Sequence, residues 1–281
     1  MDASSNGFEW RNSMKRNSVQ GISYLESGRG PVLLLLHGIP GAARTWERAA
    51  RRLERRFRVI APDLRGFGQS DDPGEDYDME GQARALKRLL EELGVRRCYI
   101  GAHDFGGPVA LTLMRIDPEL EVQGLLLAST NVFTDTFVPV PLRAAKVPIL
   151  GRALFWAMAG TRLGFRMMYA QACARKDVLR WEAFSKHATP GGLRYTSLIF
   201  RKSLSDLPRH YASVEAFLSS IAVPTVVVWG TRDPFFAVDV GRRTSEAIRG
   251  AKLIVYENTG HFVPEEQPER IAEDIERVFL P

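Results

Sequence analysis

Short runs of apolar residues alternate with longer amphipathic stretches along most of the chain. Continuous apolar runs of this length are typical of strands that are buried on both faces of a parallel sheet, and the amphipathic stretches indicate the helices that cover it. The pattern predicts strands at Gly21–Leu25, Val32–Leu36, Arg58–Ala61, Cys98–Gly101, Gly124–Ala128, Thr225–Trp229 and Lys252–Tyr256. It predicts helices at Ala43–Arg55, Met79–Leu93, Gly107–Arg115 and Pro268–Phe279.

The alternation breaks between about residues 132 and 220, where helical patterns follow one another with no convincing strand between them. This segment lies between two predicted strands of the sheet. We therefore expect an α/β core domain made of residues 1–131 and 221–281, with a helical lid at residues 132–220 inserted into it.

Composition narrows the class of protein. The 281 residues are 45% hydrophobic, which is enough for one large core, and the longest apolar run, Pro31–Leu36, is too short to span a bilayer. The N-terminus lacks the basic and apolar regions of a secretory signal, and two cysteines are too few for a disulfide framework. We expect a cytoplasmic protein that does not interact with a membrane.

The net charge of +5 changes this picture little. Arginines are frequent in residues 44–56, but glutamates are interleaved with them. That mixture is typical of a solvated helix face and not of a nucleic-acid footprint. We expect no nucleic-acid partner.

Asp104 is the residue that most restricts which reaction the protein can catalyse. It follows the apolar run Cys98–Gly101, and the small residues Ala102 and Gly106 stand two positions before and after it. This spacing predicts a sharp strand-to-helix turn that lifts one side chain above the edge of the sheet. A carboxylate there is already ionised near neutral pH, so it can attack carbon directly and form an alkyl ester.

Two further residues complete a candidate triad in the order nucleophile, acid, base. Asp233 and His261 each come directly after a predicted strand, so both lie at the carboxyl edge of the sheet with Asp104. Asp233 would orient the imidazole, and His261 would activate the water that cleaves the ester. In the turn at His37–Gly41, the amide N–H of Ile39 can form an oxyanion hole together with that of Phe105.

Each of these residues also has a structural interpretation, in which Asp104 or Asp233 caps a turn. The strand-turn-helix context favours catalysis for both, and Gly260 at a strand end favours it for His261. His37 and His103 are better explained by packing and hydrogen bonding.

Four motifs in the expected order resemble the α/β-hydrolase superfamily: the turn at residues 37–40, Pro62–Asp71, the elbow around Asp104, and Thr-Gly-His261-Phe. Within it they are similar to epoxide hydrolases and haloalkane dehalogenases, whose elbow nucleophile is aspartate. The resemblance implies a small apolar organic substrate, water as the second reactant, and no cofactor or metal ion.

The leaving group separates the two activities that the resemblance implies. Haloalkane dehalogenases typically carry a Trp after the nucleophile and an Asn in the first motif, or a Trp in the lid, as halide donors. Here Phe105 and Ile39 stand at the first two positions, so only Trp156 or Trp181 of the lid is left to serve. A fluoroacetate-type dehalogenase would have an Arg where Phe105 stands.

Epoxide hydrolases protonate the opened ring with lid tyrosines. The lid offers Tyr169, Tyr195 and Tyr211. Residues 191–195 resemble the stretch that carries one such tyrosine, which favours Tyr195, although another register puts Thr196 or Phe200 there; Tyr169 is the second candidate. Each tyrosine and tryptophan also has a plain packing interpretation. We favour an epoxide hydrolase over a dehalogenase, and we keep a tailoring enzyme or a ligand-binding member of the fold without turnover as alternatives.

Overall fold

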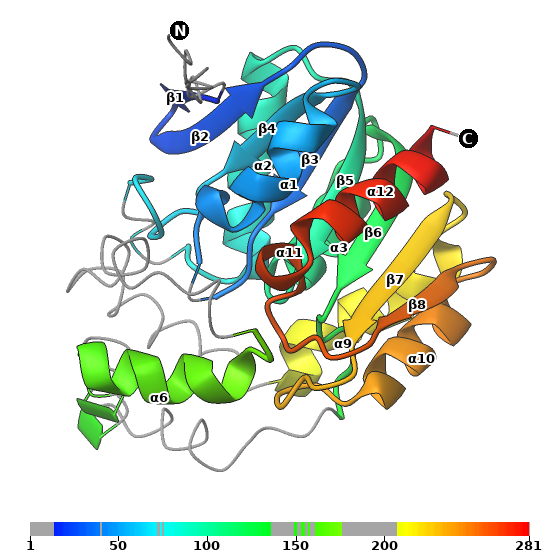
Figure 1. The fold of residues 1–281 in the computed structure, drawn as a ribbon. Coiled ribbons are helices and arrows are strands. Elements are labelled where there is room, and N and C mark those ends of the chain that lie inside the picture. Colours follow the sequence, from blue (N-terminus) through cyan, green and yellow to red (C-terminus); the bar gives the residue numbers. More distant parts are fainter. Residues whose placement is uncertain are drawn as a thin grey trace, which may run out of the picture.

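An eight-stranded sheet forms the centre of the molecule in the computed structural model, which describes residues 14–39, 41–71, 74, 76–135, 149–150, 153–154, 157, 161–175 and 207–280 (Figure 1). The strands lie in the order β1-β2-β4-β3-β5-β6-β7-β8. Their bounds are β1 Lys15–Val19, β2 Ile22–Ser27, β3 Val32–Leu36, β4 Arg58–Pro62, β5 Arg97–His103, β6 Glu121–Ala128, β7 Thr225–Gly230 and β8 Lys252–Tyr256. All seven predicted strands are present, with ends shifted by a few residues.

Strand β1 was not predicted from the sequence. It pairs antiparallel with β2 at the edge of the sheet, and its residues, Lys-Arg-Asn-Ser-Val, are exposed or half-buried. A polar edge strand lacks the apolar run that marks a central strand. Gln20 and Gly21 connect the two strands with φ angles of 47° and 76°, which is the left-handed backbone of a tight hairpin turn.

Alternate residues of the central strands point to opposite faces of the sheet. In β3, Leu34 and Leu36 join one buried cluster, whereas Leu33 and Leu35 join the other. The first cluster is covered by α2 (Met79–Glu92), α3 (Gly106–Ile116) and α10 (Val238–Ala247), and the second by α1 (Glu47–Leu53) and α12 (Pro268–Phe279) (Figure 1). The chain therefore has the three-layer α/β architecture that its sequence predicts.

The position of β3 creates the functional edge of the sheet. It lies between β4 and β5 and is parallel to both, so the chain leaves β3 first toward one side and later returns on the other. At such a switch point the loops after the strands diverge, and a crevice opens at their carboxyl ends. The loops after β3 and β5 carry His37–Gly38 and Asp104, respectively.

The helices predicted for the core are present within one or two residues, except that the first divides into a 3-10 turn, η1 (Ala43–Trp46), and α1. Helix α10 was not predicted, because only Gly241 and Thr244 of its ten residues are buried and the rest of its sequence is largely polar. The short α11 (Val263–Glu266) was not predicted either.

Within the described residues, no helix combines the length and apolar character needed to cross a membrane.

The segment expected to form a lid is described in part. It contains α6 (Arg162–Ala172), α9 (Leu207–Phe217) and the 3-10 turn η3 (Leu218–Ser220). Helix α9 packs against α3, and its Tyr211 and Val214 belong to the same buried cluster as the core helices on that face. The boundary between core and lid near residue 220 stays a prediction.

Candidate active site

Asp104 occupies a sharp turn between β5 and α3. Its φ angle is 50°, a left-handed conformation that few residues other than glycine and asparagine or aspartate adopt. The turn is fixed by three hydrogen bonds: Asp104 N–H donates to the Ala128 carbonyl oxygen at 3.1 Å, and the Asp104 carbonyl oxygen accepts from Gly107 N–H at 2.9 Å and from the Thr130 hydroxyl at 2.6 Å. The backbone strain is thus held by the surrounding structure, as it is at many reactive residues.

Small residues around the turn allow the loops to approach closely. A Cβ atom on Gly106 would lie 2.7 Å from the Leu36 carbonyl oxygen, and one on Gly107 would collide with the Thr130 side chain. A Cβ atom on Gly38 would collide with the carboxylate of Asp104 itself. The spacing of small residues that the sequence shows around Asp104 therefore has the steric cause that we expected.

The structure brings Asp104, Asp233 and His261 together from three separate loops. Asp233 follows β7 and His261 follows β8. His261 Nδ1 lies 2.9 Å from Asp233 Oδ2, and His261 Nε2 lies 3.5 Å from Asp104 Oδ2. The imidazole therefore stands between the two carboxylates, with Asp104 at its Nε2 side and Asp233 at its Nδ1 side.

The acid is held by its own loop. Asp233 Oδ1 accepts hydrogen bonds from the backbone N–H groups of Phe235, at 2.9 Å, and Phe236, at 3.1 Å, and the side chain has no exposed surface. One oxygen is thereby fixed, and the other is directed at His261. The rings of Phe235, Phe236 and Phe262 contact the imidazole at centroid distances of 4.9, 5.6 and 5.2 Å, so they exclude water from its sides.

Burial lowers the pKa of His261, but the charges and hydrogen bonds of Asp233 and Asp104 outweigh it and raise that pKa to about 10. For Asp104, burial raises the pKa, whereas the hydrogen bond and charge of His261 and the Ile39 N–H lower it more, to a net value below the usual range. Both shifts act in the direction that favours an imidazolium between two carboxylates.

The turn after β3 contributes a backbone donor. Ile39 N–H donates to Asp104 Oδ1 at 2.7 Å. This geometry agrees with the direction expected of an oxyanion-hole amide. The second amide expected in that hole belongs to Phe105, which follows Asp104 directly and is buried; its role stays a prediction.

The two neighbouring histidines are bonded to backbone groups. His37 accepts from Leu64 N–H at Nε2, at 2.9 Å, so its Nδ1 carries the proton that is shared with the Gly38 carbonyl oxygen at 2.7 Å. His103 Nε2 lies 2.9 Å from the His261 carbonyl oxygen. Burial, followed by repulsion from His261, lowers the pKa of His103 to about 4, so it is neutral. These contacts match the structural roles expected of both residues.

Glu266 ties the loop of His261 to the end of α6. Its carboxylate is fully buried and accepts from the N–H groups of Gly260, Ala174 and Arg175 at 2.8 to 3.1 Å. In the same place, His261 N–H donates to the Ala172 carbonyl oxygen at 2.7 Å. His261 is therefore anchored to a helix of the segment expected to form the lid, and the sequence pattern did not suggest this role for Glu266.

The remaining candidates fall mostly outside the described residues. This holds for Tyr195, Trp156 and Trp181, and for Tyr169 the structure describes the backbone in α6 but not the side chain. Tyr211, which we did not single out, lies in α9, is 6% exposed and has a pKa raised first by burial and then by the charge of Asp104. The burial of Tyr211 depends on how α9 packs against α3, so no local sequence signal identifies it.

Among the described residues, no group of three or more His, Cys, Asp or Glu side chains is arranged to hold a metal ion. The two cysteines, Cys98 and Cys173, are free and buried. The chemistry available at this edge of the sheet is that of the carboxylates, the imidazole and the backbone amides.

Comparison with known proteins agrees with this arrangement. The family model of the alpha/beta hydrolase fold matches residues 31–268, which is most of the chain. The chain belongs to the α/β-hydrolase family. It is therefore a hydrolase-fold protein whose elbow carries aspartate at position 104.

This α/β hydrolase has relatives with both activities considered above. It is 27% identical over 279 residues to a soluble epoxide hydrolase of Corynebacterium sp. (strain C12), covering 92% of this chain and 94% of the relative. It is 25% identical over 276 residues to haloalkane dehalogenase 2 of Mycobacterium tuberculosis, covering 89% and 88%. The crystal structure of Cfl2 from Burkholderia cenocepacia superposes with a TM-score of 0.81 at 25% identity, covering 95% of each chain.

Proposed function

We propose that this hydrolase opens a small apolar epoxide to a diol through a covalent alkyl ester on Asp104. The observation that carries the proposal is the carboxylate on the elbow, with His261 Nε2 at 3.5 Å and Asp233 behind the imidazole. An ionised carboxylate attacks carbon without a base. The base in this arrangement is therefore needed for a second step.

In the first step, Oδ2 of Asp104 attacks an epoxide carbon, the carbon–oxygen bond of the ring breaks, and its electron pair stays on the ring oxygen as an alkoxide. Oδ1 is held by Ile39 N–H at 2.7 Å, so Oδ2 is the oxygen left to attack. The low pKa of Asp104 keeps the nucleophile ionised over the whole physiological range.

In the second step, water attacks the carboxyl carbon of the ester. Esterification removes the negative charge of Asp104, and with it part of what raises the pKa of His261. The imidazole then loses its proton more easily, and as a neutral base it takes a proton from water at Nε2, while Asp233 stabilises the imidazolium that results. Charge on Oδ1 in the tetrahedral intermediate meets Ile39 N–H and, in our proposal, Phe105 N–H. When the intermediate collapses, the bond between the carboxyl carbon and Oδ2 breaks, the diol leaves with Oδ2 and takes the proton from the His261 imidazolium, and the Asp104 carboxylate is restored with an oxygen from water.

The alkoxide of the first step needs an acid. Among the tyrosines whose side chains are described, Tyr211 is the one whose pKa responds to the charge of Asp104. The raised pKa keeps its hydroxyl protonated at neutral pH, and conversion of Asp104 to a neutral ester removes the charge that opposes ionisation. We therefore add Tyr211 to Tyr195 and Tyr169 as a proton-donor candidate, within a lid that we propose to span residues 132–220.

Carbon–halogen hydrolysis is the second candidate function. The relative named haloalkane dehalogenase 2 supports it. Phe105 and Ile39 have no side-chain N–H for a halide, so the donors would have to be Trp156 or Trp181. A tailoring enzyme, or a member of the fold that binds without turnover, stays a third alternative, and neither would transfer oxygen from water.

The proposal is tested with the His261→Gln variant and a panel of epoxides and bromoalkanes. Attack by Asp104 survives in this variant while water activation fails, so intact-protein mass spectrometry should show an adduct of one epoxide mass, or of one bromoalkane mass less hydrogen bromide. Peptide mapping should then assign the adduct to the peptide that contains Asp104. The double variant Asp104→Ala/His261→Gln is the matched control and should show none. If no panel compound that the wild type converts gives an adduct, the covalent mechanism is wrong.

The leaving group is tested with Tyr211→Phe, which removes one oxygen and little volume. Loss of a general acid costs about 10²–10⁴-fold in rate. We expect a loss of that size in the alkylation step with epoxides and little change with bromoalkanes, which need no proton. Equal rates of epoxide opening in wild type and variant would exclude Tyr211 as the donor, and the same comparison then applies to Tyr195 and Tyr169. Two results together would favour the dehalogenase. The wild type would release bromide faster than it forms a diol from any epoxide, and replacing Trp156 or Trp181 would abolish that bromide release.

A further inference from the structure

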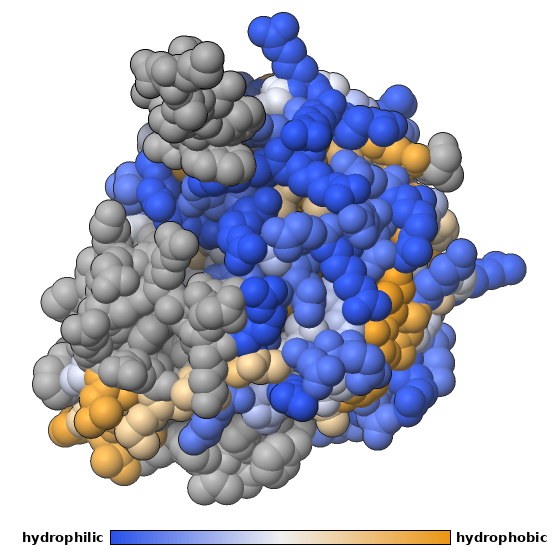
Figure 2. All heavy atoms as spheres, in the orientation of Figure 1, coloured by the Kyte–Doolittle hydropathy of each residue, from blue (hydrophilic) through white to orange (hydrophobic). Residues whose placement is uncertain are grey.

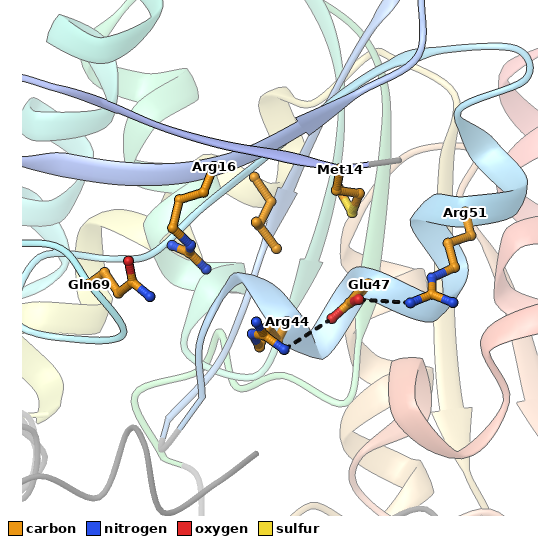
Figure 3. Close-up of a pocket in the computed structure, with 7 residues that line it drawn as sticks. Met14, Arg16, Arg44, Glu47, Arg51 and Gln69 are labelled. Carbon is orange, nitrogen blue, oxygen red and sulfur yellow. Dashed lines mark hydrogen bonds and ion pairs between the residues drawn. The ribbon is translucent and has the colours of Figure 1, made fainter. Parts of the chain in front are cut away.

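A hollow lies between the hairpin β1–β2 and the η1–α1 segment (Figure 3). Its volume is about 280 Å³, and none of its lining residues belongs to the candidate triad. The lining residues are Met14, Arg16, Leu25, Arg44, Glu47, Arg51 and Gln69. Figure 2 shows that hydrophilic residues dominate the face over α1 from which Figure 1 is viewed.

The lining carries an excess of positive charge. Three guanidinium groups face one carboxylate, that of Glu47. Arg51 binds Glu47 at 2.9 Å, whereas Arg44 lies 3.7 Å from it, beyond hydrogen-bond distance. The two arginines keep 46% and 47% of their side-chain surface exposed, so their donors are open to a ligand.

Arg44 and Arg51 differ from the other two arginines of the η1–α1 segment in their ion pairs. Arg48 is bound by Glu269 at 3.3 Å, and Arg52 is bound by Glu273 at 2.8 Å and Glu276 at 3.1 Å. All three of those glutamates belong to α12. The hollow lies away from α12, so its arginines lack that second row of carboxylates.

Arg16 supplies the decisive observation. One terminal nitrogen, Nη1, donates to Asp63 Oδ2 and to the Ser23 hydroxyl, both at 2.6 Å. The other, Nη2, is buried and has no hydrogen-bond partner among the described residues. A buried guanidinium nitrogen is seldom left without an acceptor in proteins, because its lost hydration is not replaced. Arg16 is one of the residues that line the hollow, so an acceptor bound there would lie near this nitrogen.

We propose that this hollow binds a phosphate group, either as inorganic phosphate or as part of a small phosphate monoester. Guanidinium groups approach it from β1 and from the η1–α1 segment, which suits a tetrahedral oxyanion with several acceptor oxygens. With Asp63, which pairs with Arg16, counted beside Glu47, the three guanidinium groups keep an excess of one positive charge, which favours an anionic ligand. The volume lies just below the about 300–1,000 Å³ of pockets for larger ligands, so the bound group is small.

The test is calorimetric titration of the full-length protein at pH 7.5, with ionic strength held constant by sodium chloride. One arm uses inorganic phosphate and the other uses glycerol 3-phosphate. The compound that binds more tightly shows whether the hollow prefers free phosphate or a phosphate monoester. The variants are Arg44→Gln, Arg51→Gln and the double variant. Arg48→Gln is the matched control, because Arg48 lies on the same helix as Arg51 but does not line the hollow. Thermal unfolding in chloride confirms that each variant folds.

We expect saturable one-to-one binding to wild type and to Arg48→Gln. Each of the other single variants should weaken it about tenfold, because a hydrogen bond to a charged group contributes at least that much. Absence of saturable binding in both arms, or equal affinity of wild type and the double variant, would overturn the proposal. The readout is independent of turnover, so it also stands apart from the role proposed for Asp104.

Discussion

Two buried carboxylates flank β3, one after β4 and the other after β5, and they are coordinated very differently. Asp63 has no exposed side-chain surface, and both its oxygens are occupied: Oδ1 accepts from Ala43 N–H at 2.7 Å, and Oδ2 accepts from Arg16 at 2.6 Å and Gln69 N–H at 3.0 Å. Asp104 keeps 14% of its side-chain surface exposed, with one backbone donor on Oδ1 and an imidazole 3.5 Å from Oδ2.

The difference in coordination agrees with a structural role for Asp63 and with the role that we propose for Asp104. Every oxygen of Asp63 is occupied by a fixed donor, so the residue locks β1, η1 and the turn at Gln69 together. Asp104 keeps part of its side chain exposed, and it lies on a backbone turn with a φ of 50°. The two sites share the same edge of one sheet, and the number of donors separates their roles.

The largest expected effect comes from removing the under-coordinated carboxylate. Asp104→Ala should lower turnover by at least about 10⁴-fold, as removal of a nucleophile does in other covalent enzymes. The free energy of unfolding should change by no more than about 1 kcal/mol, because the loss of a buried charge offsets the strain of alanine at positive φ. Steady-state kinetics and urea unfolding check this. Retention of a tenth of the wild-type rate would show that Asp104 is not the nucleophile.

Replacement of Asp233 by Asn should act through the imidazole. Neutral Asn does not stabilise imidazolium and favours the wrong tautomer of His261, so turnover should fall about 10⁴-fold while the alkylation of Asp104 continues. Rapid-quench kinetics that separate the two steps measure this. Near-normal turnover would place the acid elsewhere; Asn131 after β6 is a poor substitute, because it is uncharged and its amide is bound to the backbone of Phe133.

Asp63→Asn should reverse the pattern and reduce stability more than chemistry. The change leaves Arg16, which is 22% exposed, without its charged partner, and breaking such a buried pair costs about 3 kcal/mol. The midpoint of urea unfolding should drop accordingly, while turnover per folded molecule changes far less than in Asp104→Ala. A loss of turnover as large as that of Asp104→Ala, without loss of stability, would contradict the structural role of Asp63.

The fourth effect, which is gradual and does not require a substitution, is on the dependence of stability on pH. The pKa of His261 rises from the ordinary 6.5 to about 10 on folding, so its contribution to stability is fully present below pH 6.5 and is lost as pH increases through 10. In this window the free energy of unfolding should fall by up to about 1.4 kcal/mol per pH unit. His261→Gln should remove this slope. An identical slope in wild type and variant would show that His261 is not charged in the folded protein.

The sequence predicts the parts of this comparison that depend on local pattern. The strand at Leu33–Leu36 is apolar at every position, and the small residues at Ala102 and Gly106 fit only a tight turn, so the central sheet and the elbow were found. The edge strand Lys15–Val19 was missed because its burial comes from pairing with β2 and not from its own side chains.

Contacts between segments that are distant in the sequence could not be predicted from local pattern. Arg16 and Asp63 are 47 residues apart, and Glu266 meets Ala174 across 92 residues. Neither pair has a spacing that marks it. Tyr211 was considered among three lid tyrosines. The effect of the Asp104 charge on its pKa follows from the packing of α9 on α3, which the sequence pattern does not reveal.

The alkyl ester on Asp104 is tested most directly by one turnover in oxygen-18 water with enzyme in excess over substrate. In the proposed mechanism the oxygen added to the product comes from the Asp104 carboxylate, and the solvent oxygen enters that carboxylate when the ester is cleaved. Mass spectrometry should therefore find the label on the Asp104 peptide and an unlabelled product. Label in the product of the first turnover, with none on the peptide, would mean that water attacks the substrate directly and would contradict the account.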